Sequence, residues 1–267
     1  MTSLYAEVIG DPIIQSKSPT IHSFWLGKLG IDAAYRKTRV TTDELPAYFA
    51  ARRADPAWLG CNVTMPLKQA IAALVEMVDP FAARAGAINL VVRDGAGLRG
   101  GNSDGTGFIE PLGDLERGSA WLIGTGGAAR AIALALGEAG FSVSVFGRSL
   151  DRAQTIADLT GGDGRQFDEL GGPADAPALL VNATSLGMTG QPSLPISLAD
   201  WPQSTAVYDI VTSPLETGLL RDARTRGMRS FDGLQMLVGQ AAVAFERFFG
   251  QPAPRQHDAE LRALLTA

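Results

Sequence analysis

The stretch 124-GTGGAA-129 constrains the fold most, because it lies directly between a predicted strand at 120–123 and a predicted helix. It has the form G-x-G-x-x-A. The first glycine permits a tight turn, the second lets a pyrophosphate approach the backbone, and the small third residue allows close helix–strand packing. The N–H groups at the helix start can bind phosphate. This context favours a dinucleotide-binding site over the alternative, a tight turn without a ligand.

The end of the next predicted strand, 143-VSVFGRS-149, distinguishes between the two nicotinamide cofactors. An NAD site usually carries an acidic residue here for the ribose 2′-hydroxyl. This chain has Gly147, Arg148 and Ser149 instead, with Arg152 one helical turn further on. Guanidinium groups and a hydroxyl suit a 2′-phosphate, so the sequence favours NADP. The alternative is that both arginines lie on a solvated helix face.

Strand and helix signals alternate along the whole chain, which predicts an α/β fold with largely parallel sheets. The predicted strands lie at 4–10, 34–40, 58–63, 120–123, 143–149, 178–182 and 205–211. The predicted helices begin at Ser18, Thr42, Pro66, Leu150, Leu215 and Asp232. Residues 86–92 and 98–102 flank the turn 94-DGAG-97 and predict a hairpin. The Gly/Pro-rich stretch 161–177 is predicted to be a surface loop.

Composition excludes several classes of protein. With 267 residues, of which 46% are hydrophobic and 19% charged, the chain is globular, with one large domain or two modest ones. The net charge of −5 argues against nucleic acid or an anionic membrane as a partner. One cysteine, Cys61, and no secretion signal or membrane-spanning run favour the cytoplasm. With only His22 and His257 besides that cysteine, we expect no metal site.

Two candidate catalytic residues have ordinary structural alternatives. Pro66 in 62-NVTMPLKQA-70 suits the first residue of a helix, which would place Lys68 in the first turn, near the positive end of the helix dipole. From the residues alone, a solvated surface lysine is the preferred interpretation. Asp104 lies in the Gly-rich loop 101-GNSDGTG-107, where a helix N-cap is the common role of an aspartate.

Other polar residues are candidates for substrate binding. Ser18 suits an N-cap, but Ser16 and Ser18 together could also bind a carboxylate at the helix start. Gln240 lies on the apolar face of the predicted helix 232–250, so its amide needs a protein, water or ligand partner. His22, beside packed residues of a helix, is interpreted as structural.

Beyond these local patterns, the chain resembles the shikimate dehydrogenase family over its full length. The resemblance rests on ordered motifs: GDPIIQSKSPTIH, NVTMPLK, GAIN, GNSDGTG, GTGGAARA, GRSLDRA, NATSLGM, YDIV followed by P and ET, and DGLQMLVGQAAVAFE. The family reduces 3-dehydroshikimate to shikimate with NADPH, a step toward chorismate and the aromatic amino acids. The resemblance implies a substrate domain at 1–104 and 236–267, a Rossmann-type NADP domain at 105–235, and an active site in the cleft between them.

The resemblance also assigns roles to individual residues. It implies that Lys68 and Asp104 are catalytic. The implied substrate-binding residues are Ser16, Ser18, Thr64, Asn89, Thr212 and Gln240, the two serines holding the substrate carboxylate. The implied NADP-binding residues are Gly124, Thr125, Gly126, Gly127, Ala128, Arg148, Ser149, Arg152, Thr184, Ile210 and Gly233. A lysine beside positive helix ends and a carboxylate can pass a proton to a developing alkoxide, so Lys68 is expected to be the acid in reduction, oriented by Asp104.

Several positions depart from the family pattern. Gln15 replaces a common His, and Ser103 replaces a Thr but keeps the hydroxyl. Leu90 replaces a Thr next to Asn89, Thr212 replaces a Tyr that usually reaches the substrate, and Gly239 replaces a common Tyr. These changes leave the reaction type intact, but the loss of Tyr at Thr212 keeps a quinate-type paralogue as an alternative. A non-catalytic NADP-binding protein is a second alternative, against which Lys68 and Asp104 argue, and a folate-linked dehydrogenase is a less supported third. The expected partner is a small-molecule substrate, and the oligomeric state stays open between monomer and homodimer.

Overall fold

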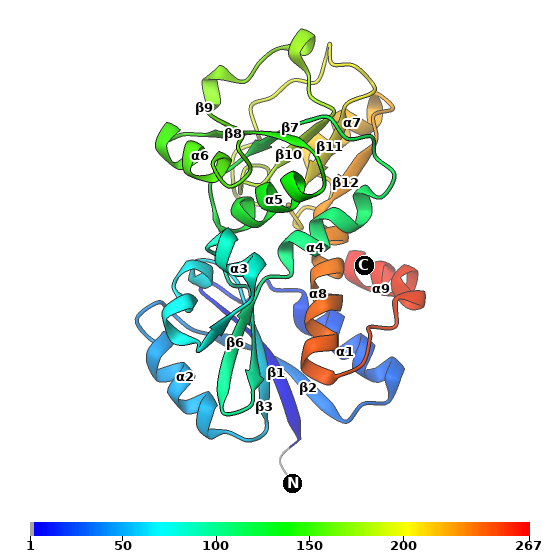
Figure 1. Ribbon diagram of the computed structural model, residues 1–267. Coiled ribbons are helices and arrows are strands. Elements are labelled where there is room, and N and C mark those ends of the chain that lie inside the picture. Colours follow the sequence, from blue (N-terminus) through cyan, green and yellow to red (C-terminus); the bar gives the residue numbers. More distant parts are fainter. Residues whose placement is uncertain (1–2) are drawn as a thin grey trace. The chain divides into compact units, whose positions relative to one another are not determined.

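The computed structural model describes residues 3–267, and the chain divides into two compact units. Unit 1 is the chain up to Asp104 together with Val238–Ala267, and unit 2 is Gly105–Leu237 (Figure 1). The chain returns to unit 1 at residue 238, where the family resemblance implied 236. Within residues 3–267, no helix has the length and apolar character needed to cross a membrane.

Unit 1 is built on a six-stranded sheet with the order β2-β1-β3-β5-β6-β4. Its strands are β1 (Leu4–Gly10), β2 (Ala33–Arg39), β3 (Trp58–Val63), β4 (Met77–Val78), β5 (Leu90–Asp94) and β6 (Gly97–Gly101). Strands β2, β1 and β3 run parallel. Strand β5 is antiparallel to β3 and to β6, which confirms the predicted hairpin. The turn of that hairpin contains Gly95, whose φ of 58° suits a residue without a side chain.

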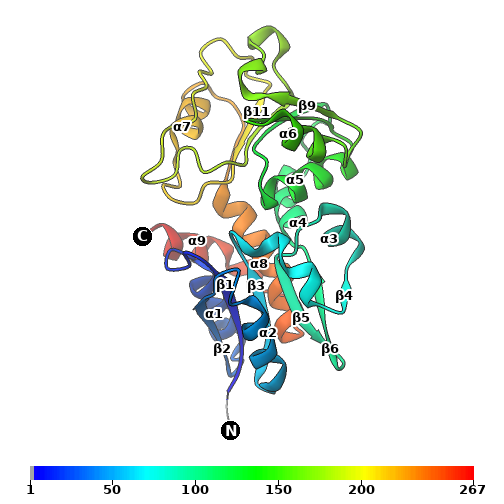
Figure 2. The same ribbon diagram turned by 90° about the vertical axis from the view of Figure 1, so that its left-hand side faces the viewer.

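The helices of unit 1 come from both ends of the chain (Figures 1 and 2). They are α1 (Ser18–Leu29), α2 (Leu45–Ala54), α3 (Pro80–Ala85) and α9 (Asp258–Thr266), together with most of α8 (Gly233–Phe249). Asp104, the last residue of the first segment, begins α4 (Asp104–Ile109). Gly250, with a φ of 68°, follows α8, as expected for a helix that ends at glycine.

Helix α1 begins at Ser18 as predicted, but its predicted N-cap is wrong, and so are the predicted starts of α2 and of the helix expected from Leu215, which begins at Gly218. The N-cap of α1 is Lys17 rather than Ser18, while the Ser16 hydroxyl accepts the N–H of Ser18 at 3.3 Å. Helix α2 begins at Leu45 rather than Thr42. The carboxylate of Glu44 turns back to accept the N–H of Thr41 at 2.8 Å, which keeps this segment in a turn outside the helix.

The helix predicted to begin at Pro66 is also wrong. The chain forms two short 3₁₀ turns there, η1 (Leu67–Gln69) and η2 (Ile71–Leu74). The carbonyl of Lys68 accepts the N–H of Ile88 at 2.8 Å, so a tertiary contact takes the acceptor that an α-helical bond would need. Lys68 is therefore positioned by a three-residue turn, and a helix dipole does not account for its placement.

A buried aromatic cluster surrounds His22 in unit 1. Its ring stacks on Tyr35 with centroids 3.9 Å apart and also packs against Phe245 of α8. Neither ring nitrogen has a hydrogen-bond partner among residues 3–267. Burial lowers the pKa of His22 to about 3, because the charged imidazolium would lose its hydration there.

Unit 2 is a doubly wound sheet of six parallel strands with the order β12-β11-β10-β7-β8-β9. Its strands are β7 (Ser119–Ile123), β8 (Ser142–Gly147), β9 (Asp163–Gln166), β10 (Leu179–Asn182), β11 (Ala206–Asp209) and β12 (Ser230–Asp232). Its helices include α5 (Gly127–Glu138), α6 (Leu150–Ala157) and α7 (Gly218–Thr225). This strand order is that of a Rossmann fold, which confirms the predicted fold class.

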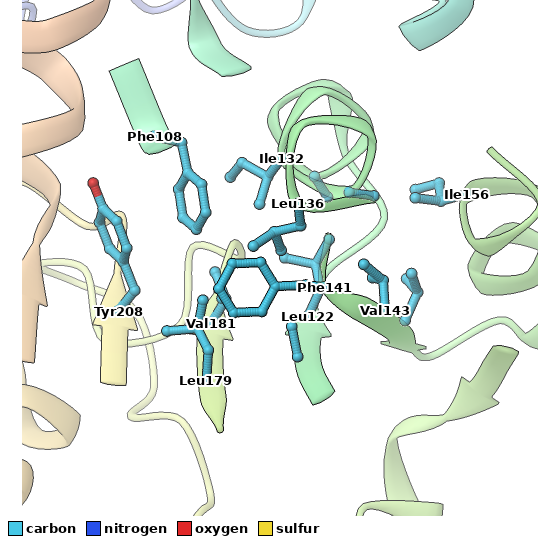
Figure 3. Close-up of a cluster of buried hydrophobic side chains, with 14 of the residues drawn as sticks. Phe108, Leu122, Ile132, Leu136, Phe141, Val143, Ile156, Leu179, Val181 and Tyr208 are labelled. Carbon is cyan, nitrogen blue, oxygen red and sulfur yellow. The ribbon is translucent and has the colours of Figure 1, made fainter. Parts of the chain in front are cut away.

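Alternate residues of β7, β8, β10 and β11 belong to different cores, because both faces of the sheet are covered at these strands. Leu122 packs with Ile132 and Leu136 of α5 (Figure 3), whereas its neighbour Trp121 packs with Trp201 in the other core. Phe108 of α4 stacks on Tyr208 with ring centroids 4.4 Å apart. Each such side chain contributes roughly 1.5–3 kcal/mol when fully buried.

The predicted surface loop at 161–177 is wrong at its start, which forms the edge strand β9. A Cβ on Gly164 would lie 2.3 Å from the backbone nitrogen of Gln154 in α6. Glycine at this position therefore lets the chain approach α6 closely enough to pair with the free edge of β8.

Candidate active site

An ion pair between Lys68 and Asp104 forms the centre of the site in unit 1. The Nζ of Lys68 donates to Oδ2 of Asp104 at 2.6 Å, and the two side chains are only 14% and 6% exposed. Lys68 lies on η1, just after β3, and Asp104 lies just after β6. The pairing of β3 with β5 and of β5 with β6 brings these distant residues together. A lysine paired with a carboxylate at low exposure is suited to proton transfer.

The second oxygen of the Asp104 carboxylate is held by Asn89. The amide Nδ2 of Asn89 donates to Oδ1 of Asp104 at 2.8 Å. The amide orientation of Asn89 is fixed in turn, because its Oδ1 accepts the backbone N–H of Ser103 at 2.7 Å. Both carboxylate oxygens therefore have a donor from the chain itself, which presets the geometry around Lys68.

Two residues of this network, Asn102 and Ser103, were not predicted from the sequence as site residues. Oδ1 of Asn102 accepts the N–H of Asp104 at 2.9 Å, and its Nδ2 donates to the carbonyl of Ala87 at 2.9 Å. Ser103 is fully buried. Their local signal in the sequence is a polar Asn-Ser pair inside the Gly-rich stretch before Asp104, which is also typical of an ordinary turn, and the hydroxyl that Ser103 shares with the family's Thr is a second signal.

Gln240 connects α8 to this network. The hydroxyl of Ser103 donates to Oε1 of Gln240 at 3.4 Å, and Gln240 is only 8% exposed. The polar side chain predicted on the apolar face of the last long helix therefore has a protein partner. It places an amide beside the residues that hold Asp104.

Ser16, Ser18 and Thr64 lie on segments that follow neighbouring strands of unit 1. Ser16 and Ser18 come after β1, and Thr64 comes directly after β3. These segments are joined through their backbones, since Asp11 donates to the carbonyl of Met65 at 3.1 Å. Because β1 and β3 are parallel, their carboxyl ends meet at one edge of the sheet. Thr212 does not join this group within unit 1, because it belongs to unit 2.

The predicted phosphate-binding turn in unit 2 lies between β7 and α5. Gly124 has a φ of 129°, and a Cβ there would lie 2.7 Å from the carbonyl oxygen of Ala183, so the fold itself requires glycine. Gly126 has a φ of −90°, which any residue can adopt, and a Cβ there would meet nothing within 4 Å. Packing does not explain Gly126, but the close approach of a pyrophosphate would. Thr125, Gly127 and Ala128 complete this turn and the start of α5.

The predicted 2′-phosphate site is at the junction of β8 and α6. Ser149 is the N-cap of α6, and its hydroxyl accepts the N–H of Arg152 at 3.5 Å. Arg148 and Arg152 are exposed, and neither forms an ion pair with another residue in the described range 3–267. Two unpaired guanidinium groups beside a helix N-terminus fit a phosphate group.

The remaining predicted cofactor residues follow the next parallel strands. Thr184 comes just after β10, Ile210 just after β11, and Gly233 just after β12, at the sheet edge where Rossmann folds bind nucleotides. The glycine at position 233 is also required by packing. A Cβ there would lie 2.3 Å from the carbonyl oxygen of Ile210.

A buried polar pair, Asn182 and Asp209, holds Thr184 and was likewise not predicted from the sequence. Oδ1 of Asn182 accepts the hydroxyl of Thr184 at 2.7 Å, and its Nδ2 donates to Oδ1 of Asp209 at 3.0 Å. Burial raises the pKa of Asp209, while hydrogen bonds from Thr217, Val211 and Asn182 oppose that shift. This pair connects the ends of β10 and β11 and fixes the segment that carries Thr184.

The fold and the two groups of residues together define an α/β dehydrogenase with a separate substrate unit and dinucleotide-binding unit. Residues 8–91 match the shikimate dehydrogenase substrate binding domain, and residues 233–260 match the shikimate 5′-dehydrogenase C-terminal domain. A shikimate dehydrogenase (NADP(+)) from Sphingopyxis alaskensis is 50% identical over 271 residues, which cover 99% of this chain and 98% of that relative. The chain belongs to the shikimate dehydrogenase family.

Solved structures agree with this assignment. The crystal structure of shikimate 5-dehydrogenase from Thermus thermophilus, in complex with NADP(H) and shikimate, matches with a TM-score of 0.88 and 35% identity. The match covers 98% of this chain and 99% of that chain. Quinate dehydrogenase from Corynebacterium glutamicum, in complex with NAD, matches with a TM-score of 0.85 and 28% identity, over 98% of this chain and 99% of that chain.

Proposed function

We propose that this chain catalyses the reversible NADP-dependent reduction of 3-dehydroshikimate to shikimate. The observation that carries the proposal is the Lys68–Asp104 pair, held at 2.6 Å and at low exposure in the unit that matches a substrate binding domain. Relatives named shikimate dehydrogenase (NADP(+)) and a related structure in complex with NADP(H) and shikimate support the same reaction and the same cofactor. The cytoplasm is the proposed site of action, supported by the single, buried cysteine.

Substrate binding is proposed for polar residues at the strand ends of unit 1. Ser16 and Ser18 hold the carboxylate, because two hydroxyls at the start of α1 suit an anion. Thr64, Asn89 and Gln240 hold ring hydroxyls, and the same role is proposed for Thr212 in unit 2.

Lys68 is the proposed proton donor in reduction and the proton acceptor in oxidation. NADPH, when bound to unit 2, supplies the hydride to the carbonyl carbon. The ammonium of Lys68 gives its proton to the carbonyl oxygen as negative charge develops there. Asp104 holds the ammonium in place, and Asn89 holds Asp104. Hydroxyl formation thus takes one hydride from the cofactor and one proton from Lys68.

The cofactor preference is proposed from the exposed arginines of unit 2. Arg148 and Arg152 contact the 2′-phosphate of NADP, and Ser149 adds a hydroxyl at the start of α6. Gly126 leaves room for the pyrophosphate. Thr184, Ile210 and Gly233 extend the site along the strand ends, toward the ribose and nicotinamide.

A quinate-type substrate is the second candidate, and Leu90 and Thr212 keep it open. Both positions lack the polar or aromatic side chain common in the family, and a quinate dehydrogenase is among the structural relatives. Steady-state oxidation of shikimate and of quinate, each with NADP+ and with NAD+, tests both proposals. Turnover that is strong only with shikimate and NADP+ supports the main proposal. Strong quinate turnover with weak shikimate turnover would replace it.

A further inference from the structure

The loop that carries the proposed carboxylate-binding serines is tied to the last helix of the chain. Between Ser16 and Ser18 lies Lys17, whose Nζ donates to the carbonyl oxygen of Leu265 at 2.9 Å. Leu265 lies in the last turn of α9, where carbonyl groups have no intrahelical donor. A cation there also interacts favourably with the negative end of the helix dipole. The bond joins residues 248 positions apart within unit 1.

Helix α9 is itself firmly attached to unit 1. Leu261 is fully buried and Leu265 is 8% exposed, so one face of the helix packs into the unit. Lys28 of α1 forms an ion pair with Glu260 at 2.7 Å, and Figures 1 and 2 both show α9 beside α1. The acceptor of the Lys17 bond is therefore fixed by contacts that do not involve the serine loop.

The first half of the serine loop is held by the ion pair of Asp11 with Arg39 at 2.9 Å and by the buried side chain of Ile13, so the residues that need a further anchor are those next to the serines. Residues 11–17 of the loop form no helix or strand, and the side chain of Ile14 is 81% exposed. Lys37 donates to the carbonyl of Ile14 at 2.6 Å, in the middle of the loop. Lys17 holds the end of the loop, directly beside both serines.

We propose that Lys17 is a positioning residue that fixes Ser16 and Ser18 for the substrate carboxylate by anchoring the junction between their loop and α1 to α9. This inference rests on the proposed function, because it assumes that the serines bind that carboxylate. Lys17 then acts on the substrate only through the two serines. The carbonyl of Leu265 is as important for this anchor as the ammonium of Lys17. Loss of either group weakens substrate binding without touching the proton transfer at Lys68.

The experiment removes the donor and the acceptor separately and measures steady-state oxidation of shikimate. For Lys17→Met, we expect the KM for shikimate to rise roughly fivefold, with kcat and the KM for NADP+ within about twofold of the parent. Lys17→Arg keeps a donor and should restore most of the loss. A chain ending at Leu264 lacks the acceptor but keeps the Lys17 charge, and it should show the same increase in KM.

Two controls are matched to these variants. A chain ending at Leu265 keeps the acceptor oxygen and should retain the parent KM. Lys28→Met breaks another bond between α1 and α9, remote from the serines, and should also retain the parent KM. An increase in KM for Lys17→Met but not for the chain ending at Leu264 would overturn the proposal in favour of a direct contact between Lys17 and substrate. Unchanged KM values in both would overturn it as well.

Hydrogen exchange separates this proposal from the proposed function and replaces the truncation if that chain does not fold. Faster amide exchange at residues 11–18 in Lys17→Met supports the anchor, and unchanged exchange overturns it. A parent protein that does not oxidise shikimate refutes the proposed function. The exchange measurement would still report on the anchor in that case.

Discussion

The proposed catalytic group of unit 1 and the proposed phosphate site of unit 2 are arranged in opposite ways. In unit 1 the side chains around Asp104 are bonded to one another, so both carboxylate oxygens already have donors. In unit 2, Arg148 and Arg152 form no ion pair with any described residue, and Gly126 faces open space. A network whose hydrogen bonds are all made without a ligand holds the catalytic side chains in place, whereas donors that have no protein partner are suited to bind a ligand. Changes in the Lys68–Asp104 network should therefore lower kcat, and changes at the phosphate site should raise the KM for NADP+.

Removing Lys68 should give the largest effect. Lys68→Ala takes away the proposed proton donor, and we expect kcat to fall by about a thousandfold. Asp104, only 4% exposed, would also lose its cationic partner, so thermal stability should fall. Stopped-flow or steady-state oxidation of shikimate, with a thermal melt by circular dichroism, measures both effects.

The matched control is Lys68→Arg. A guanidinium keeps the positive charge beside Asp104 but does not release its proton near neutral pH. We therefore expect this variant to regain thermal stability without regaining turnover. Near-normal turnover in a folded Lys68→Ala protein would contradict the proposed role and the comparison itself.

In the phosphate-binding turn, we expect Gly124 to be needed for folding and Gly126 to be needed for binding of the cofactor. Gly124→Ala forces a side chain into φ 129° and toward the backbone of Ala183, so we expect about 2–4 kcal/mol of lost stability. Gly126→Ala should change stability by less than about 0.5 kcal/mol, since its methyl group meets no protein atom. It should nevertheless weaken NADP+ binding by about tenfold, because the methyl group obstructs the pyrophosphate.

Denaturant unfolding and fluorescence titration with NADP+ measure the two glycine variants. If Gly126→Ala lost stability but bound NADP+ normally, Gly126 would serve the fold and not the cofactor. In that case the open space beside Gly126 would have no connection with the cofactor.

The same contrast explains how much of the molecule could be predicted from its sequence. The turn around Gly124 was predictable, because its glycines, the strand before it and the helix after it are all local signals. The segment after Pro66 was not, because the carbonyl of Lys68 bonds to Ile88, and no local pattern shows that contact. Strand β9 was missed for a similar reason, since its sequence DGRQ has low strand propensity and pairs only because Gly164 fits against α6.

The site residues divide in the same way. Lys68, Asp104 and Asn89 were named through a family resemblance, and in the structure Lys68 and Asn89 each donate a hydrogen bond to Asp104. Asn102 and Ser103 were missed because asparagine and serine before a helix are ordinary turn residues. Only the tertiary contacts to Ala87 and Gln240 distinguish them from such residues.

Removing the arginines of unit 2 should have a smaller effect than removing Lys68, and on a different constant. For Arg148→Ala and for Arg152→Ala, we expect the KM for NADP+ to rise about tenfold each, because each loses a charge-assisted bond to the 2′-phosphate. The KM for shikimate and kcat should stay near the parent values. NAD+ lacks that phosphate, so kcat/KM with NAD+ serves as the internal control. An equal loss with both cofactors would instead place the arginines on the pyrophosphate or in a purely structural role.

The smallest effect concerns the free energy of unfolding at mildly acidic pH, which should depend on a histidine of unit 1. Both histidines lie there, and residues 105–237 contain none. The pKa of His22 is lowered by burial to about 3 in the folded state, against an ordinary value of 6.5. The unfolded chain therefore binds more protons between those two values, and stability must fall as the pH decreases below 6.5.

From these two values, the loss attributable to His22 is about 1.4 kcal/mol by pH 5.5. Replacing the imidazole in His22→Phe keeps an aromatic ring beside Tyr35 and removes the titrating group, so this part of the acid sensitivity should disappear. Urea unfolding of both proteins at pH 7.5 and pH 5.5 measures the difference, and hydrogen exchange assigns it to a unit. Equal losses of stability in the two proteins would show that His22 gains a proton without leaving its cluster. The aromatic cluster around His22 would then be less rigid than its stacked rings indicate.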